Sequence, residues 1–114
     1  MTITETTHSN IHLVALKGAL DASTAATLAK NSVLSGNLPT VIDLSGIDFL
    51  DSSGLGALVG IARKKRAANS DTLLACLNTN VRKVFEITHA YRLFDIYDDP
   101  YTAAEELSKK ISAL

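Results

Sequence analysis

The amino-acid sequence predicts an α/β domain with a mixed, mostly parallel sheet of about five strands and about four helices. Three observations support this fold class. The chain has 114 residues, which fits one domain of ordinary size. Hydrophobic residues make up 46% of it and charged residues 20%, a globular composition that can form a packed core. Short apolar runs alternate with segments of helical periodicity, as in strands joined by helices. We therefore expect a single domain over residues 1–114.

Two strands are predicted at the N-terminus. A short strand near residues 2–6 is expected to form a hairpin with the next one, at the edge of the sheet. In the segment Ile11–Leu16, most residues on each of the two strand faces are apolar, so this second strand should be covered on both faces. Gly18 is predicted to end it, because glycine weakens a strand.

A helix and a central strand should follow. Asp21 or Ser23 can cap a helix that runs to about Leu34 and has Ala25, Leu28, Ala29 and Ser32 on one face. Residues 41–44 are apolar except for an aspartate and predict a buried strand. Residues 45–51 are expected to form a loop into the next helix.

The second helix is predicted to begin within a residue or two of Ser53. Its apolar positions fit the spacing i, i+3, i+4, i+7 of a helix that packs on a sheet. These positions are Leu55, Leu58, Val59 and Ala62. The basic run Arg63–Arg66 falls in the last turn, where cations complement the helix dipole, and is expected to be solvated.

The C-terminal part repeats the alternation. A strand over 72–77 precedes a helix from about Asn80, and a strand over 93–97 precedes a helix from Pro100. The first of these helices should bury Val81, Val84 and Phe85. The second has Tyr101, Ala104, Leu107, Ile111 and Leu114 on one side.

Composition makes several classes of function improbable. Eleven Lys and Arg against twelve Asp and Glu give a net charge of -1, so the positive field that nucleic acids or anionic membranes require is missing. The longest small and apolar run, Leu55–Ala62, is far shorter than the ~20 residues of a membrane-spanning helix. Cys76 is the only cysteine, which excludes an intrachain disulfide and suggests a small core residue. We expect a cytoplasmic protein without membrane insertion, direct nucleic-acid binding or a bound metal.

The most distinctive segment is Asp51–Gly56, of sequence DSSGLG, at the predicted start of the second helix. The first N–H groups of a helix lack intrahelical partners and can accept a hydroxyl cap or an anion. Ser52 and Ser53 supply hydroxyls there, and Gly54 and Gly56 would let a partner backbone or a phosphate approach closely. Equally, one serine could simply cap the helix while the glycines simply permit a tight bend.

This segment does not stand alone. Together with Gly18–Asp21, Val41–Gly46 and Val81–Phe85, the stretch Phe49–Leu58 resembles the STAS domains of bacterial anti-sigma factor antagonists, and the resemblance covers nearly the whole chain. In such antagonists the serine after the motif aspartate is phosphorylated, and that serine corresponds to Ser52 here. The resemblance implies a partner switch in the regulation of transcription, for example in stress responses.

By this resemblance, the unphosphorylated domain binds an anti-sigma factor that is also a serine kinase, and so frees the sigma factor. A phosphatase restores the unphosphorylated form. The domain itself needs no cofactor and supplies no catalytic group. Asp21, Asp51, Ser53, Gly54 and Gly56 would surround the phosphorylation site, with Ser53 mainly capping the helix or supporting the motif and Ser52 just outside the helix.

Helix geometry predicts where the partner binds. At about 100° per residue, Ser53, Gly56, Ala57 and Gly60 fall together opposite the core positions. Ile61 and Lys64 border this face. Its small side chains would leave a flat surface for a partner.

Three further functions can be considered. Similar domains serve as adaptor subunits of lipid ABC transporters. Gly54, Gly56 and Gly60 form a degenerate dinucleotide fingerprint, compatible with weak nucleotide binding, but Gly60 is one residue too late and a loop is expected between strand and motif. A serine hydrolase would need a GxSxG elbow, and His89 is the only histidine after Ser52.

Overall fold

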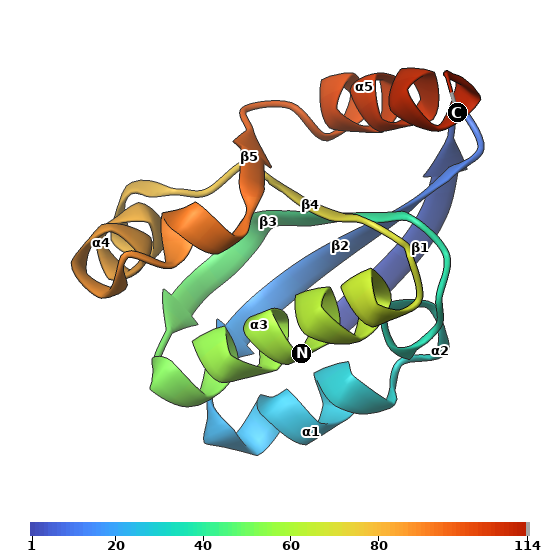
Figure 1. Cartoon of the computed structure of the whole chain (residues 1–114). Coiled ribbons are helices and arrows are strands. Elements are labelled where there is room, and N and C mark those ends of the chain that lie inside the picture. The colour runs from blue at the N-terminus through green and yellow to red at the C-terminus, as the bar shows by residue number, and fades with distance from the viewer. Residues whose placement is uncertain (114) are drawn as a thin grey trace.

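The computed structural model describes residues 1–113 and contains one five-stranded sheet in the order β1-β2-β3-β4-β5 (Figure 1). The strands are β1 (Thr2–His8), β2 (Ile11–Leu20), β3 (Thr40–Leu50), β4 (Thr72–Ala75) and β5 (Asp95–Tyr97). The hairpin strands β1 and β2 are antiparallel, and each later strand runs parallel to its neighbour. The predicted mixed sheet with an N-terminal hairpin is confirmed.

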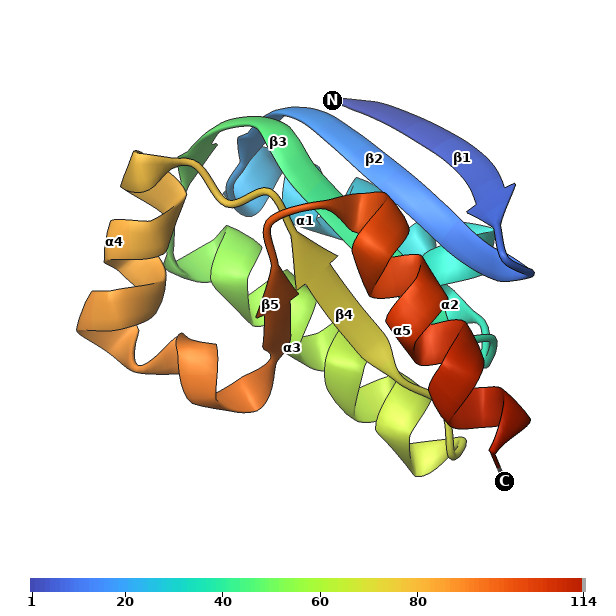
Figure 2. The ribbon, with the colours of Figure 1, turned by 90° about the horizontal axis from the view of Figure 1, so that it is seen from above.

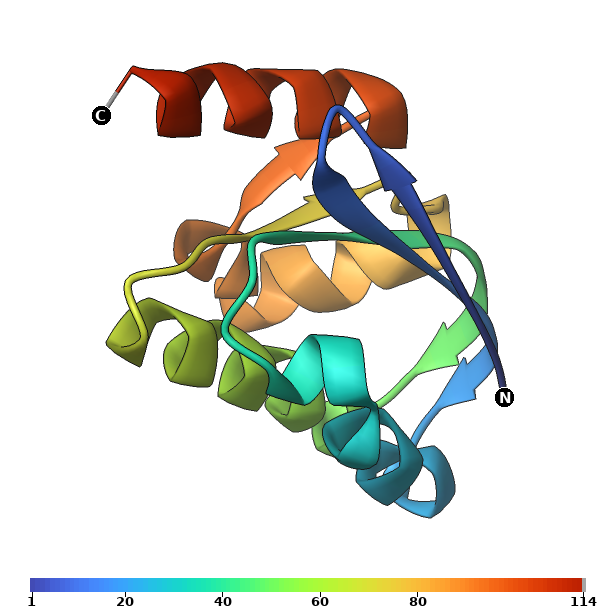
Figure 3. The same ribbon diagram turned by 90° about the vertical axis from the view of Figure 1, so that its right-hand side faces the viewer.

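The helices form two layers. They are α1 (Ala22–Lys30), α2 (Ser32–Ser35), α3 (Ser52–Ala67), α4 (Thr79–Thr88) and α5 (Pro100–Ser112), with a 3-10 turn, η1 (Ala90–Leu93), before β5. Figures 1 and 3 show α1, α2, α3 and α4 on one side of the sheet and α5 on the other. Figure 2 shows α5 lying over the sheet on its own face, with its axis roughly along β4.

Because side chains alternate along a strand, the sheet separates two hydrophobic clusters. In β3, Val41 packs in the cluster under α5, whereas Ile42 and Leu44 pack in the larger cluster with α1, α3 and α4. The central strands are therefore apolar on both faces, as the sequence predicted for the second strand.

Two predicted strand boundaries are wrong, because both central strands continue past them. β2 does not end at Gly18, whose φ of 119° is accommodated by register shifts on both sides of it. Residues 45–50 are not a loop but the second half of β3, and they pair with the end of β2, where Leu50 lies opposite Leu20. Both strands extend because the backbone N–H and C=O groups of β2 and β3 pair with each other beyond the predicted boundaries.

The predicted helix 21–34 is interrupted at Asn31. This residue has extended backbone angles, and its side chain accepts hydrogen bonds from the N–H groups of Val33 and Leu34, so it caps a separate turn, α2. The interruption lets both Leu28 and Leu34 point into the core, while Ala29 and Ser32 are not buried.

Later elements deviate less from the sequence-based expectations. The fourth strand ends at Ala75 because Cys76 has a left-handed φ of 62°, and η1 delays the last strand to Asp95. Of the α5 residues that were predicted to share one side, Ala104 and Leu107 are buried, but Tyr101 and Ile111 are exposed. Leu114 lies outside the described residues.

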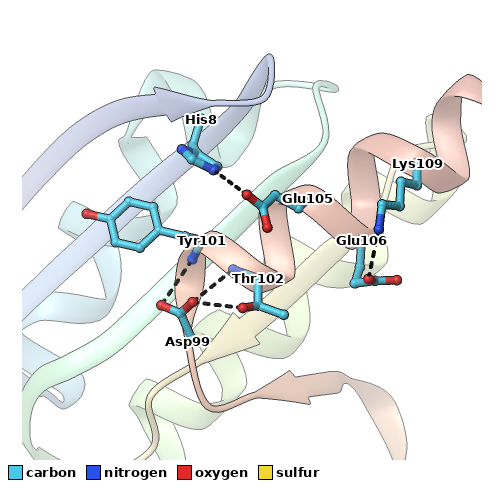
Figure 4. Close-up of polar contacts among 7 residues, drawn as sticks. All are labelled: His8, Asp99, Tyr101, Thr102, Glu105, Glu106 and Lys109. Carbon is cyan, nitrogen blue, oxygen red and sulfur yellow. Dashed lines mark hydrogen bonds and ion pairs between the residues drawn. The ribbon is translucent and has the colours of Figure 1, made fainter.

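Polar contacts cap α5 and connect it to the hairpin formed by β1 and β2 (Figure 4). Asp99 caps the helix and accepts hydrogen bonds from the N–H groups of Tyr101 and Thr102 and from the Thr102 hydroxyl. These bonds, the hydroxyl's above all, lower the pKa of Asp99. At the end of β1, His8 lies 3.1 Å from a Glu105 carboxylate oxygen and meets the Tyr101 ring edge-on.

One residue predicted to be solvated, Lys65, is fully buried. Its ammonium Nζ donates hydrogen bonds to the backbone carbonyls of Val33, Gly36 and Leu38 at 2.9, 3.0 and 2.9 Å. Burial lowers the pKa of Lys65, while the three carbonyl oxygens favour its charged form. This lysine therefore ties the C-terminal half of α3 to α2 and to the segment between α2 and β3.

Candidate functional site

The candidate site lies where two parallel strands end side by side. Leu20 of β2 pairs with Leu50 of β3, so the residues that follow them, Asp21 and Asp51, begin two neighbouring helices. The N–H of Asp51 donates to the carbonyl of Leu20 at 3.1 Å and joins the two turns. The N-termini of α1 and α3 therefore lie next to each other at one edge of the sheet (Figure 1).

Asp51, rather than a serine, caps α3. Its Oδ1 accepts a hydrogen bond from the N–H of Gly54 at 3.0 Å. The helix begins at Ser52, which confirms the predicted start but places Ser52 in the first turn and not outside the helix. Both Ser52 and Ser53 are exposed, and the predicted capping role of Ser53 is wrong because the aspartate provides the cap.

The two glycines of the motif differ. A Cβ on Gly54 would lie 2.2 Å from the carbonyl oxygen and 2.8 Å from the Cβ of Leu20, so the close approach that it allows is to β2 of the same chain. A Cβ on Gly56 would meet nothing within 4 Å. Of the two, only Gly56 offers its open side to another molecule.

Charge around the helix ends is negative. Asp21 accepts hydrogen bonds from the Ser23 hydroxyl at 2.6 Å and from the N–H groups of Ser23 and Thr24, which lower the pKa of Asp21, the hydroxyl most strongly. Asp51 adds a second carboxylate beside Ser52. A phosphate on this serine would therefore join an already negative region.

The exposed face of α3 agrees with the predicted partner surface except at one position. Ser53, Gly56, Gly60 and Lys64 are exposed and Ala57 is half-buried. Ile61, however, is 5% exposed and belongs to the core, because α2 packs on this side of α3. Beside this face is a shallow groove of about 210 Å³, lined by Ala29, Leu34, Ser35, Ala57, Gly60, Ile61 and Lys64.

The sequence did not predict one exposed aromatic residue of this region. Phe49 is 52% exposed near the end of β3, two residues before Asp51. The sequence offers a signal, an aromatic residue directly before the motif, but the segment was expected to be a loop. In the structure this segment is a strand, in which Phe49 pairs with Ala19 of β2.

The turn between β3 and α3 is poorly suited to nucleotide binding. The loop expected between strand and motif is absent, since β3 leads directly into Asp51, and this feature alone would favour a nucleotide-binding turn. However, the N–H of Gly54 already donates a hydrogen bond to the Asp51 carboxylate, and the Leu20 backbone fills the space beside Gly54. This turn therefore does not offer a phosphate a free N–H group at Gly54 or space beside it.

The histidines of the chain do not form a hydrolytic site with Ser52. His8 contacts Glu105, His89 lies beside Tyr91 at 3.5 Å, and no hydrogen bond found within residues 1–113 joins Ser52 to any of the three histidines. Within residues 1–113, no group of three His, Cys, Asp or Glu side chains is placed to hold a metal ion. None of the helices described for these residues is both long enough and apolar enough to cross a membrane.

Comparison with known proteins gives a family match. Residues 2–103 match the family model of the STAS domain. BtrV of Bordetella bronchiseptica, named as a candidate anti-sigma factor antagonist, is 27% identical over 95 residues, which cover 81% of this chain and 82% of BtrV. Matches over about half of each chain reach an anti-sigma F factor antagonist of Lysinibacillus sphaericus and an anti-sigma-B factor antagonist of Listeria monocytogenes, both 34% identical.

Solved structures share the fold. A Thermotoga maritima protein, described as a candidate anti-sigma factor antagonist, superposes with a TM-score of 0.81 at 22% identity, covering 92% of this chain and 93% of that one. The STAS domain of a SulP transporter from Vibrio cholerae superposes with a TM-score of 0.70 at 17% identity, covering 91% and 84%. The same fold thus occurs in regulators and in transporters.

Proposed function

This chain belongs to the STAS domain family, and from that premise we propose that it is an anti-sigma factor antagonist controlled by phosphorylation of Ser52. Its curated relatives are named as antagonists of anti-sigma factors, which supports an anti-sigma factor as the partner. The observation that carries the proposal is local: Ser52 is exposed, follows the motif aspartate and opens the helix whose outer face is free for a partner.

Phosphorylation would act through charge rather than by unfolding α3. A phosphate adds about 1.5 to 2 negative charges, and the N-terminus of a helix tolerates negative charge well. Two unit charges ~6 Å apart interact by roughly 0.7 kcal/mol in water and by roughly 3 kcal/mol at an effective dielectric constant of ~20. Repulsion between this phosphate and an acidic group of the partner would thus change affinity by ~3-fold to ~150-fold, enough for a switch.

The proposed cycle needs two enzymes besides this chain. An anti-sigma factor with serine kinase activity binds the unphosphorylated domain, releases its sigma factor and phosphorylates Ser52. A phosphatase removes the phosphate and restores binding. The STAS domain serves as substrate and ligand and provides no catalytic group of its own.

Ser52 is expected to be the phosphorylated residue. When wild type, Ser52→Ala and Ser53→Ala are incubated with the cognate kinase and ATP, intact-mass measurement should show one phosphate on wild type and Ser53→Ala and none on Ser52→Ala. Both serines are exposed neighbours, so Ser53→Ala is a matched control for the loss of a hydroxyl. Labelling that persists in Ser52→Ala and disappears in Ser53→Ala would move the site. Recovery of a transporter ATPase, and of no kinase, in a pull-down would favour the adaptor function instead.

Gly60→Arg is expected to weaken kinase binding at least tenfold with little change in melting temperature. The position is exposed and a Cβ there would meet nothing within 4 Å, so arginine should fit the free domain and obstruct only a partner. Ile87→Arg, at a position 79% exposed on α4, introduces the same charge elsewhere and should leave binding intact. Calorimetric titration measures both. Unchanged affinity in Gly60→Arg would exclude this face of α3 as the partner surface.

A further inference from the structure

A polar pocket of about 170 Å³ lies at the opposite end of α3 from Ser52. It is bordered by the last turns of α3, by the start of β4 and by η1 with the residues after it. The helix has 16 residues and is therefore ~24 Å long, so this pocket is far from the proposed phosphorylation site. The side chains of interest are Arg66, Ser70, Thr72 and Arg92.

Two hydroxyls in the pocket lack partners. Ser70 is 8% exposed, and the Oγ of Ser70 and the Oγ1 of Thr72 are both buried without a hydrogen-bond partner among residues 1–113. Most buried polar atoms in native proteins are hydrogen-bonded, because burial removes the bonds that water would make. Both residues line the pocket, and rotation about χ1 would bring their hydroxyls to its surface, where a polar ligand can supply the missing partner.

Strand alternation gives the direction of Thr72. Leu74 belongs to the cluster on the α3 side of the sheet and Leu73 to the cluster under α5. Since alternate residues share a face, Thr72 faces the α3 side together with Leu74. Its hydroxyl therefore lies on the side of the sheet from which Arg66 of α3 approaches.

The two acidic residues that border the pocket point elsewhere. Asp71 extends to α5, where its carboxylate lies 3.1 Å from the Nζ of Lys110. On β5, Ile96 packs on the α3 side, so the side chain of its neighbour Asp95 faces the other side of the sheet. The charges left on the α3 side of the pocket are positive.

Neither arginine is neutralised within the described part of the chain. The ion pairs found for residues 1–113 include neither Arg66 nor Arg92, and the guanidinium of Arg92 lies 5.9 Å from the ring centre of Tyr91. Guanidinium groups bind phosphate oxygens through paired, charge-assisted hydrogen bonds.

We propose that this pocket binds a tetrahedral oxyanion, either inorganic phosphate or the phosphate group of a small monoester. Arg66 and Arg92 contact the anion, and the hydroxyls of Ser70 and Thr72, turned toward the pocket by rotation about χ1, donate to its oxygens. The pocket volume is several times the ~30 Å³ that a water molecule occupies in the liquid, which leaves room for such an anion. The site is independent of Ser52 and of the proposed partner switch.

Titration of the whole chain with sodium phosphate and with glycerol 3-phosphate, each against sodium chloride at equal ionic strength, tests this proposal. Phosphate should raise the melting temperature and chloride should not. Arg66→Gln and Arg92→Gln should each weaken binding about tenfold. Arg63→Gln, an exposed arginine of the same helix that does not line the pocket, should bind as wild type does. Tighter binding of glycerol 3-phosphate identifies a monoester, and tighter binding of phosphate the free anion.

Ser70→Ala provides a second readout. Because the hydroxyl has no protein partner within residues 1–113, this variant should not lose melting temperature in chloride, yet it should bind phosphate more weakly. Amide chemical shifts should change at Ser70–Leu73 and near Asp95. Shifts confined to Ser52–Leu55 at the other end of α3, equal loss of binding in Arg63→Gln and Arg66→Gln, or equal effects of phosphate and chloride would overturn the proposal.

Discussion

Gly54→Ala is expected to lower the free energy of unfolding by about 3 kcal/mol or more, whereas Gly56→Ala should leave it unchanged or raise it slightly. A methyl group on Gly54 would overlap the backbone of Leu20, and neither the strand nor the helix can move without breaking the bond between Asp51 N–H and the Leu20 carbonyl. At Gly56 the space is open, and alanine favours a helix by about 0.5 to 1 kcal/mol over glycine.

Urea unfolding of the two variants measures this difference directly. The comparison is well matched, since both glycines lie in the first turns of α3 and the substitution is the same. Equal stability of the two variants would mean that the contact between α3 and β2 is looser than the structure has it. Loss of kinase binding in Gly54→Ala alone would not identify a partner contact, because the position is buried.

Lys65→Met is expected to lower the free energy of unfolding by about 3 kcal/mol, and Lys64→Met by much less. Methionine fills a similar volume but leaves the carbonyls of Val33, Gly36 and Leu38 without their shared donor. Lys64 is exposed and has no such role in the described structure.

Chemical denaturation and amide exchange together check the lysine. Exchange should accelerate most at Leu34 and Gly36, near the carbonyl groups that lose their donor. A Lys65→Met variant as stable as Lys64→Met would show that those carbonyls are satisfied in another way. Because Lys64 borders the proposed partner surface, only stability, and not kinase binding, is compared between the two.

These two positions hold α3 at both ends. Gly54 sets the helix against the end of β2, and Lys65 binds it to α2 and to the segment that leads into β3. With the helix fixed in this way, Ser52 and Gly60 remain on the exposed face, and Arg66 is carried to the opposite pocket. The anchoring thus supports both proposed sites without belonging to either.

Much of the site could be placed from the sequence. The DSSGLG segment identified the start of α3, and the spacing of Leu55, Leu58, Val59 and Ala62 gave its buried side, although Val59 is only half-buried. The serine singled out for phosphorylation is exposed, as its function would require. The capping role of Asp51 was not predicted, since aspartate and serine are both good caps and local sequence does not choose between them.

The sequence by itself determined the alternation of strands and helices, the mixed sheet and the core-facing stripe of α3, because these follow from hydrophobic periods of two and 3.6 residues within short segments. Only the tertiary structure decided that residues 45–50 extend β3, that Gly54 faces Leu20 and that Lys65 is buried. Each of these depends on hydrogen-bonding groups or steric contacts supplied by a segment distant in sequence. A basic run at a helix end is normally solvated, and Lys65 departs from this because chain folding brings three carbonyl oxygens to its ammonium group.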